Sequence, residues 1–404
     1  MVVAFVLLLA GFFVKAAVVP FHFWLADAYA VAPTPVCILL AGVVSELGLY
    51  AAARVYFTVF SGVLGDHASS LRGVLLGAAV LTALVGGVMC FLQHHLARLL
   101  SFATVSHVGI TLAGVALLAP AGSGGAFLYL VTDGLVKASL FVGVGVVQQR
   151  LATIDERELH GQGRGLPWTF GLLVAGALGL AGVPPFGTFL GKALMEDAAA
   201  GAGHPWLPWL FVLASALTAA AVLRAALRVF TGWGPPAGAR EPQPAGVAEG
   251  PEQGQESTRR WPRTPPVMLT PAFGLLALAL ALGLVPGLSA RAERAADHFQ
   301  DRAGYAAAVL DGVTGAQAAG VHEPARLGPA VAFAALTAVL AFGLALGAVF
   351  RHRAPAGPRR AVRRAWQPVA SGLRGLHSGQ VGDSITWLTV GTACLGALLV
   401  LALR

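Results

Sequence analysis

The sequence predicts an all-α membrane protein, a polytopic bundle of about ten transmembrane helices, and three observations support this fold class. Of the 404 residues, 56% are hydrophobic and only 11% are charged, whereas a water-soluble domain carries about a quarter charged residues. The mean hydropathy is +0.73. Apolar runs also recur along the chain at the length of about 20 residues that a helix needs to cross a bilayer.

These apolar runs predict the spans in order. The spans lie near residues 2–19, 34–60, 72–92, 102–119, 124–148, 168–198, 205–231, 267–289, 328–350 and 385–403. The first run looks superficially like a signal peptide, but it lacks a basic start, and Lys15 stands where such a peptide would be cleaved. We therefore expect it to be the first span of the mature protein.

The run 168–198 is too long for one plain crossing. Pro184, Pro185 and Gly187 lie in its middle, together with Gly191. These residues predict a helix that breaks at membrane depth, where irregular backbone is tolerated only if protein or a wet cavity supplies hydrogen-bond partners.

The composition divides the chain into two membrane units. Residues 1–231 form the first, residues 232–266 a solvated flexible linker rich in Pro, Gly, Glu, Gln and Arg, and residues 267–404 the C-terminal helices. Within the last unit we expect segment 290–327 to lie along the outer interface. The arginine-rich loop 351–384 should face the cytoplasm, as should the linker, so that Met1 starts outside.

The basic residues are distributed unevenly. Only three of the 27 are lysines, and Lys15, Lys137 and Lys192 each lie in a long apolar run. A lysine in a low-dielectric setting can lose and regain its proton, whereas arginine stays protonated, so the pattern indicates a proton path. A GC-rich genome would explain the scarcity of lysine but not its placement. Each lysine could also be a structural pair member or an anchor that extends to the interface, as we expect of Arg54.

Other ionisable residues interrupt the apolar runs. Asp133 lies one turn before Lys137, and Tyr129 one turn before Asp133, so all three share a helix face. Glu46 lies near the middle of the predicted span 34–60, and His107 lies in the first turns of the predicted span 102–119. A charge exposed to lipid costs at least about 2.5–3.5 kcal/mol, so these groups should face one another or a hydrated interior. Alternating acids and bases suit stepwise proton transfer.

Plainer interpretations remain for several of these residues. Asp133 and Lys137 could form a static ion pair that holds helices together, and His107 could be a satisfied core histidine. For Glu196 and Asp197 we expect a solvated helix end.

Four segments resemble the antiporter-like proton-translocating subunits shared by respiratory complex I and Mrp-type cation/proton antiporters. They are KAAVVPFHFWLADAYAVAPTP at 15–35, LARLLSFATVSHVG at 96–109, YLVTDGLVKASLF at 129–141 and LGLAGVPPFGTFLGK at 178–192. They are distributed over most of the stretch 1–230, and their order and spacing are specific. The TDGLVK segment and YAAAVL at 305–310 look more like the Mrp D-type subunit, whereas LHSGQVGDSITWL at 376–388 looks like the end of complex I subunit-5-like members.

The resemblance implies a role for each lysine. Lys15 corresponds to the lysine of the family's seventh helix, which modulates proton release, Lys137 to the lysine toward the channel centre, and Lys192 to the lysine of the broken twelfth helix, which passes the proton on. Glu46 departs from the family, because many members carry lysine there. This acid either impairs transfer or serves as the partner of Lys15.

The family's first six helices have no counterpart in this chain, including the glutamate that pairs with Lys15, so half of the inverted repeat is missing. Three explanations follow: a longer reading frame that starts upstream, a separate protein that supplies the first half, or a loss of transport. We favour the first two, because six helices would shield Lys15 and Lys192 from lipid.

The function implied is that of a membrane subunit that translocates protons, or exchanges cations for protons, within a multisubunit NADH:quinone oxidoreductase-like or Mrp assembly. The path would run through Lys15, Glu46, Asp133, Lys137 and Lys192, with His107 as a further candidate. Partners would be other membrane subunits, protons, Na⁺ or K⁺, and the lipid of a cell membrane, in bacteria the plasma membrane; no nucleic acid is expected. The alternatives are a non-conducting structural or assembly subunit and an independent secondary solute transporter that binds its substrate at the broken helix.

No cofactor, metal or catalytic residue is predicted. Cys37, Cys90 and Cys394 are too scattered for a metal site or a disulfide framework, and Gly-rich nucleotide motifs are lacking. The chain is therefore at most a membrane component of an NADH–quinone oxidoreductase-type translocase, whose redox chemistry would belong to partners.

Overall fold

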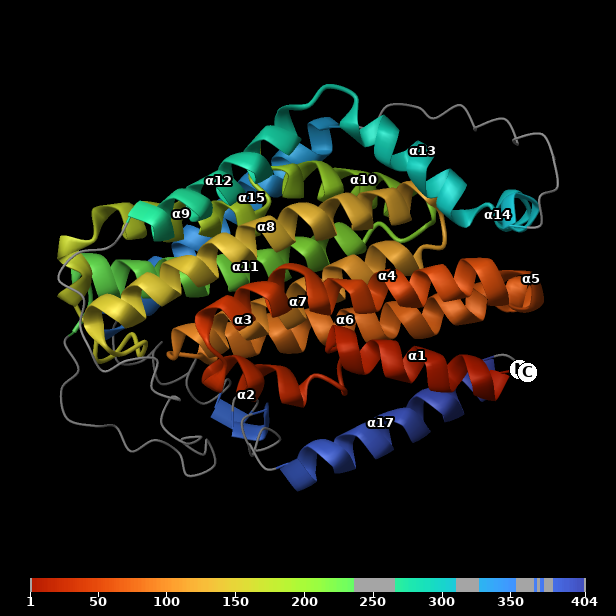
Figure 1. Ribbon diagram of the computed structural model, residues 1–404, viewed down its shortest axis with the longest axis horizontal. Coiled ribbons are helices and arrows are strands. Elements are labelled where there is room, and N and C mark those ends of the chain that lie inside the picture. Colours follow the sequence, from red (N-terminus) through yellow and green to blue (C-terminus); the bar gives the residue numbers. More distant parts are fainter. Residues whose placement is uncertain are drawn as a thin grey trace.

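The computed structural model describes residues 2–235, 266–309, 327–353, 367–368, 371–373 and 381–402. Their regular structure is helical, and the extended pairing among them is a single isolated bridge between His95 and Asp155. Most of the long helices run along one axis, which lies horizontal in Figure 1. The all-α membrane bundle predicted from composition is confirmed.

The helices follow the predicted spans closely. In chain order they are α1 Val2–Ala16, α2 Phe23–Val31, α3 Thr34–Leu39, α4 Ser45–Val55, α5 Ser61–Leu64, α6 Ala68–Leu92, α7 Leu96–Ala116, α8 Pro120–Leu151, α9 Pro167–Ala181, α10 Gly187–Gly201, α11 Leu207–Ala226, α12 Pro266–Leu284, α13 Leu288–Gln300, α14 Arg302–Val309, α15 Leu327–Val349 and α17 Val381–Ala402. Wider π-helical turns, Leu40–Val44 and Tyr56–Phe60, flank α4, and another, Leu227–Thr231, extends α11.

Seven stretches of the described residues are long and apolar enough to cross a membrane. The longest, Thr34–Leu92, reverses direction at the short turn Gly65–His67 and so contains two arms, α3–α5 and α6 (Figure 1). When these arms are counted separately and α1 and the α9–α10 pair are added, the predicted number of ten is recovered.

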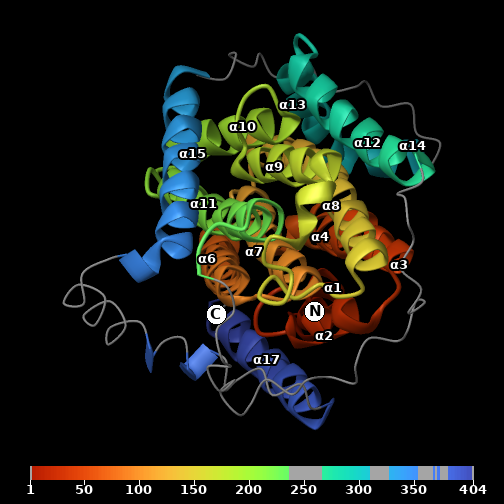
Figure 2. The same cartoon turned by 90° about the vertical axis from the view of Figure 1, so that its left-hand side faces the viewer.

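Helix α7 forms the centre of the bundle, and every residue from Leu96 to Ala116 except Arg98 is buried. In Figure 2 it lies among α4, α6, α8 and α11, while α12, α15 and α17 lie at the periphery. Small residues bring α6 and α7 together: a Cβ atom on Gly109 would lie 2.3 Å from the backbone nitrogen of Ala83. Close approach of this kind is typical of helices packed in membranes.

The predicted break in the long helix is confirmed. Helix α9 ends at Ala181, Gly182 adopts a left-handed conformation with φ of +69°, and α10 begins at Gly187. The Thr188 hydroxyl donates to the Gly179 carbonyl at 2.8 Å, and the Lys192 ammonium to the Ala181 carbonyl at 3.4 Å. Side chains of α10 thus satisfy carbonyl groups that the break leaves open.

Helices α13 and α14 pack on the bundle at the end opposite the start of α9 (Figure 1). The Arg54 guanidinium donates to the Phe299 carbonyl at 3.1 Å and stacks over the Tyr305 ring at 4.6 Å. Arg54 is therefore held by α13 and α14, and its role as an anchor at the interface remains a prediction.

Several predicted segments fall partly outside the described residues. These are the linker 232–266, of which 236–265 lie outside, the segment 290–327, of which 310–326 lie outside, and most of the loop 351–384. The interfacial position of 290–327, the cytoplasmic position of the loop and the division into units remain predictions.

Candidate functional site

A cluster of charged side chains lies buried between α4 and α8. The Lys137 ammonium is 2.5 Å from Glu46 Oε1 and 2.7 Å from Asp133 Oδ2. The three side chains are at most 2% exposed. The expectation that these charges face one another rather than lipid is met by this geometry.

Local structure explains how Glu46 reaches α8. Asp133 and Lys137 are one turn apart on α8, and Gly134 lies between them. The π-helical turn Leu40–Val44 approaches α8 closely at Gly134, because a Cβ atom on Gly134 would lie 2.6 Å from the Gly42 carbonyl oxygen. Glu46 follows that turn directly at the start of α4. π-helical turns occur often at functional sites.

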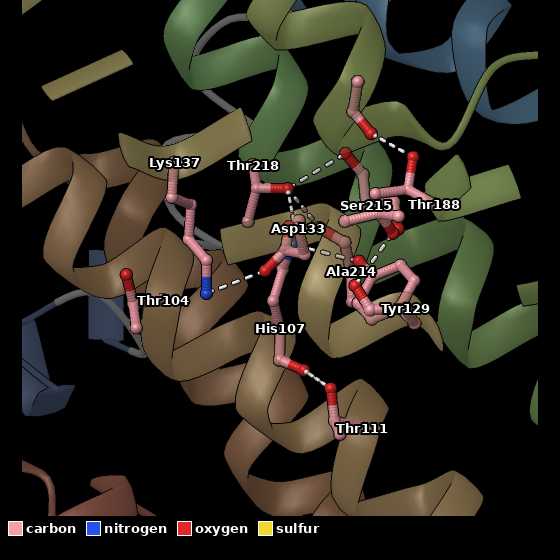
Figure 3. A network of polar contacts seen from close by, with 12 residues as sticks. Thr104, His107, Thr111, Tyr129, Asp133, Lys137, Thr188, Ala214, Ser215 and Thr218 are labelled. Atoms are coloured by element: carbon pink, nitrogen blue, oxygen red, sulfur yellow. Dashed lines mark hydrogen bonds and ion pairs between the residues drawn. The ribbon is translucent and has the colours of Figure 1, made fainter. Parts of the chain in front are cut away.

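His107 joins this cluster from α7. Its Nδ1 lies 2.6 Å from Asp133 Oδ1 and 3.0 Å from the Tyr129 hydroxyl, and its Nε2 lies 3.0 Å from the Thr218 hydroxyl (Figure 3). The Thr218 hydroxyl also lies 3.1 Å from the Ser215 carbonyl, to which it can donate.

The contact between His107 and Asp133 requires a proton, because a bare nitrogen and an ionised oxygen would repel each other at 2.6 Å. The His107–Asp133 contact is therefore a hydrogen bond whose hydrogen lies between Nδ1 and Oδ1. Lys137 faces two carboxylates, Glu46 and Asp133, and buried charge is costly unless it is neutralised.

Lys192 lies on α10 and is 3% exposed. Its ammonium donates to the Ser215 hydroxyl at 3.3 Å and to the Ala181 carbonyl at 3.4 Å. Ser215 of α11 thus contacts Lys192, and Thr218, three residues later on the same helix, contacts His107. The sequence reasoning missed both hydroxyl residues, although their spacing of three in an apolar helix puts them on one face.

Two sequence expectations are wrong. Glu196 is buried at 7% exposure on α10, one turn after Lys192, rather than in a solvated helix end, while Asp197 is partly exposed. Glu46 binds Lys137 and does not serve as the partner of Lys15.

Lys192 is shielded by helices of this chain, because α11, α12 and α15 all contact α10.

Lys15 lies apart from the other candidates. It ends α1 and is exposed, and no ion pair joins it to another described residue. Its predicted part in proton transfer is therefore not supported by a contact with the buried cluster.

A second buried ionic group lies at the end of the bundle where α8 leads into α9. Glu156, fully buried in the connecting loop, is 2.5 Å from His94 Nδ1, 3.2 Å from Arg224 Nε and 3.6 Å from Arg228 Nη1. Burial alone would raise the pKa of Glu156, but Arg224, His94 and Arg228 outweigh it and lower this pKa to about 2. Burial also lowers the pKa of His94. The loop is thus bound to the ends of α6 and α11.

Replacing Glu156 by Gln should lower the free energy of unfolding by about 3 kcal/mol near neutral pH, because the buried arginines lose their counter-charge. Since the folded-state pKa lies below the ordinary value of 4.5, ionised Glu156 stabilises the fold above pH 4.5, and this stability is lost as the pH falls toward about 2. The difference between variant and wild type should shrink over that window. Thermal unfolding in detergent at a series of pH values measures it, with Glu158→Gln, an exposed position, as the control. A difference that does not change with pH would contradict the role of the charge.

The described residues contain no group of three or more His, Cys, Asp or Glu side chains that could hold a metal ion. The arrangement is instead a set of titratable groups and hydroxyls that exchange hydrogen bonds across α4, α8, α7, α11 and α10. The fold and this site together define a polytopic helical membrane protein with a buried series of contacting titratable side chains.

The family follows from comparison with known proteins. Residues 1–218 match the model described as NADH:quinone oxidoreductase/Mrp antiporter, TM, and the chain belongs to this family. The resemblance drawn from the four sequence segments is confirmed.

Individual relatives cover different parts of the chain. The NAD(P)H-quinone oxidoreductase chain 4-3 of a Nostoc species is 35% identical over 185 residues, 46% of this chain and 32% of the relative. The D-type subunit of the Na(+)/H(+) antiporter of Bacillus subtilis is 28% identical over 306 residues, 76% of this chain and 57% of the relative. The chain thus spans about a third of the first relative and somewhat more than half of the second.

A solved structure of an Mrp complex from a Dietzia species contains a similar fold. The TM-score is 0.63 at 28% sequence identity, over 76% of this chain and 61% of the matched one.

Proposed function

We propose that this chain is a membrane subunit that translocates protons, or exchanges a cation for protons, within a multisubunit assembly. The observation that carries the proposal is the series of polar contacts from Glu46 through Lys137, Asp133 and His107 to Thr218, which Ser215 continues to Lys192. All of these side chains are buried. A static core does not need alternating acids and bases in this order, whereas stepwise proton transfer does.

Charge coupling would drive the steps. A proton that arrives on Glu46 weakens its bond to Lys137, and Lys137 then binds Asp133 more strongly. Asp133 in turn favours loss of the proton that it shares with His107. The Thr218 hydroxyl bonds the Ser215 carbonyl, and the Ser215 hydroxyl accepts from Lys192, so these two residues would couple the cluster to Lys192 through the polarity of their contacts and not through a continuous file of hydroxyl groups.

The relatives suggest what the assembly is. They are named as a chain of an NAD(P)H-quinone oxidoreductase and as the D-type subunit of a Na(+)/H(+) antiporter. On this basis we place the chain among other membrane subunits of a complex I-like or Mrp-like assembly in a cell membrane, in bacteria the plasma membrane, with Na⁺ or K⁺ as the exchanged cation in the second case. Any oxidation of NADH or reduction of quinone would be carried out by those partners.

Lys15 fits this assembly as a contact residue. It shares the outer surface of α1 with exposed Val3, Leu7 and Leu8. A lysine exposed to lipid costs about 2.5–3.5 kcal/mol, so we propose that further protein covers this face of α1.

Proton flux through the assembled complex tests the function. The complex, purified through a tag on this chain and reconstituted into vesicles with an enclosed pH dye, should carry protons when its electron donor or a cation gradient is supplied. Flux that requires another solute would support a solute transporter. A complex purified instead through a tag on another subunit, whose flux is unchanged when this chain is left out, would show a structural role, and either result would overturn the proposal.

A further inference from the structure

Basic side chains gather at the end of the bundle where α8 leads into α9 and where α11 and α15 end. They come from the loop that follows α8, the last turns of α11 and the turn that follows α15. The basic cluster consists of Arg157, His160, Arg164, Arg228, Arg351 and Arg353. The acids of these described segments are Asp155, Glu156 and Glu158, so positive charge is in excess. The proposed proton path includes none of these residues.

The loop after α8 is bound to the last turns of α11. The Arg164 guanidinium donates to the Thr231 carbonyl at 3.3 Å, and the Gly161 amide donates to the Arg228 carbonyl at 3.0 Å. His160 interacts electrostatically with both Arg228 and Arg164. The basic residues of the loop and of α11 therefore lie side by side.

The turn after α15 meets the end of α11 through aromatic rings. The centroids of the Trp233 and Phe350 rings are 5.7 Å apart, and the Arg353 guanidinium lies 4.9 Å from the Phe350 centroid. Arg351 interacts electrostatically with Arg228. The basic cluster is therefore one surface that three segments far apart in the chain build together.

Two buried polar atoms of the basic cluster have no hydrogen-bond partner among the described residues. They are Nε of Arg228, whose side chain is 13% exposed, and Nδ1 of His160. Arg228 interacts with the acid Glu156, but also with the like charges of Arg224 and Arg351. Buried polar atoms are nearly always hydrogen-bonded, and crowded positive charge needs compensation. An anion with several acceptor oxygens, such as a phosphate, meets both needs.

The position of the basic cluster identifies the source of the phosphate. The apolar stretches that contain α11 and α15 end at Thr231 and Val349, next to the cluster. Trp168 and Trp233 at the same end are 70% and 45% exposed. Tryptophan is enriched where the bilayer meets water, at the level of the lipid headgroups. The cluster therefore lies at the depth of the headgroups.

We propose that the basic cluster binds the phosphate headgroup of an anionic phospholipid. The headgroup oxygens accept hydrogen bonds from Arg228 Nε and from His160 when its Nδ1 carries the ring proton, while exposed Arg164 and Arg351 add positive charge. The acyl chains lie beside Trp233 and α15. Basic pockets between membrane helices bind lipid headgroups in this way. The site does not depend on the proposed function, because its residues lie outside the proton path.

Photolabelling tests the site. The assembled complex in neutral detergent is irradiated with a phosphatidylglycerol that carries a diazirine near the top of one acyl chain, and labelled peptides of this chain are quantified by mass spectrometry. Label should concentrate around Trp233 and residues 346–353. Unlabelled phosphatidylglycerol should displace it at concentrations at least about tenfold lower than phosphatidylcholine, which has no net charge. Inorganic phosphate at the same concentration should leave the label in place.

Three outcomes of the labelling would overturn the proposal. Displacement by inorganic phosphate would assign the basic cluster to a free anion. Equal displacement by phosphatidylcholine and phosphatidylglycerol would show contact through the acyl chains alone. Absence of label at this end of the bundle would show that lipid does not occupy it.

A double variant measures the contribution of the arginines. In Arg164→Gln with Arg351→Gln, both exposed, the midpoint of displacement by phosphatidylglycerol should rise about thirtyfold, since each surface arginine contributes about fivefold to binding of an anionic lipid. The matched control is Arg291→Gln with Arg294→Gln, two exposed arginines of α13 at the opposite end of the bundle (Figure 1). Thermal unfolding checks that both variants fold. An unchanged midpoint in the first variant, or an equal rise in the control, would contradict the site.

Discussion

Replacing Lys137 by Met is expected to abolish proton flux and to destabilise the protein at the same time. Lys137 is the only cation in contact with both Glu46 and Asp133 among the described residues. Without it, two ionised carboxyl groups would remain buried, and breaking a buried pair in this way costs about 3–5 kcal/mol. Flux in reconstituted vesicles and the midpoint of thermal unfolding in detergent measure the two effects.

A second substitution separates stability from transport. In the double variant Lys137→Met with Glu46→Gln, the uncompensated charge on Glu46 is removed, so much of the lost stability should return. Flux should stay absent, because neither group can then bind and release a proton. Thr337→Ala is the control for both measurements, since the Thr337 hydroxyl donates to the Phe333 carbonyl within α15, far along the chain from the cluster. Recovery of flux together with stability would show that the cluster is structural.

Replacing Lys192 by Met should abolish proton flux but, unlike the replacement of Lys137, should leave the stability of the protein nearly unchanged. Among the described residues the Lys192 ammonium donates to two neutral groups, the Ser215 hydroxyl and the Ala181 carbonyl, and Glu196 influences it electrostatically. Removing this cation leaves no directly bonded carboxylate without its partner. We therefore expect the assembled complex to keep its thermal stability and to lose proton flux by at least about a hundredfold, as for loss of a group that transfers protons.

The comparison of Lys192→Met with Lys192→Arg refines this prediction. Arginine keeps the positive charge but does not release its proton, so flux should remain absent although the charge is preserved. Restored flux in the Arg variant would show that Lys192 acts by charge alone. A complex that fails to assemble in both variants would assign Lys192 to structure instead.

The sequence predicted the membrane architecture well because the bilayer imposes strong local rules. A membrane span needs a continuous apolar run of residues. Pro184, Pro185 and Gly187 predict the break between α9 and α10, because these residues interrupt a helix. The pair of Asp133 and Lys137 was also predictable, since helical spacing alone puts them on one face.

Contacts between helices could not be predicted in the same way. Glu46 and Lys137 are 91 residues apart in the sequence. The residues around them do not predict that the π-helical turn before Glu46 directs the Glu46 carboxylate toward Lys137 rather than toward Lys15. The burial of Glu196 and the contacts of Ser215 with Lys192 and of Thr218 with His107 depend on how α10 and α11 pack against neighbours far along the chain.

The sequence by itself therefore determined the class of protein, its spans, its broken helix and the identity of the ionisable residues within the membrane. Only the tertiary structure decided which of those residues meet, because the rotation and approach of each helix depend on packing with distant segments. It brought Glu46, Asp133, Lys137 and His107 into one buried cluster and left Lys15 outside it. A charged side chain in a low-dielectric environment needs a partner, but the packing of the helices decides which residue that partner is.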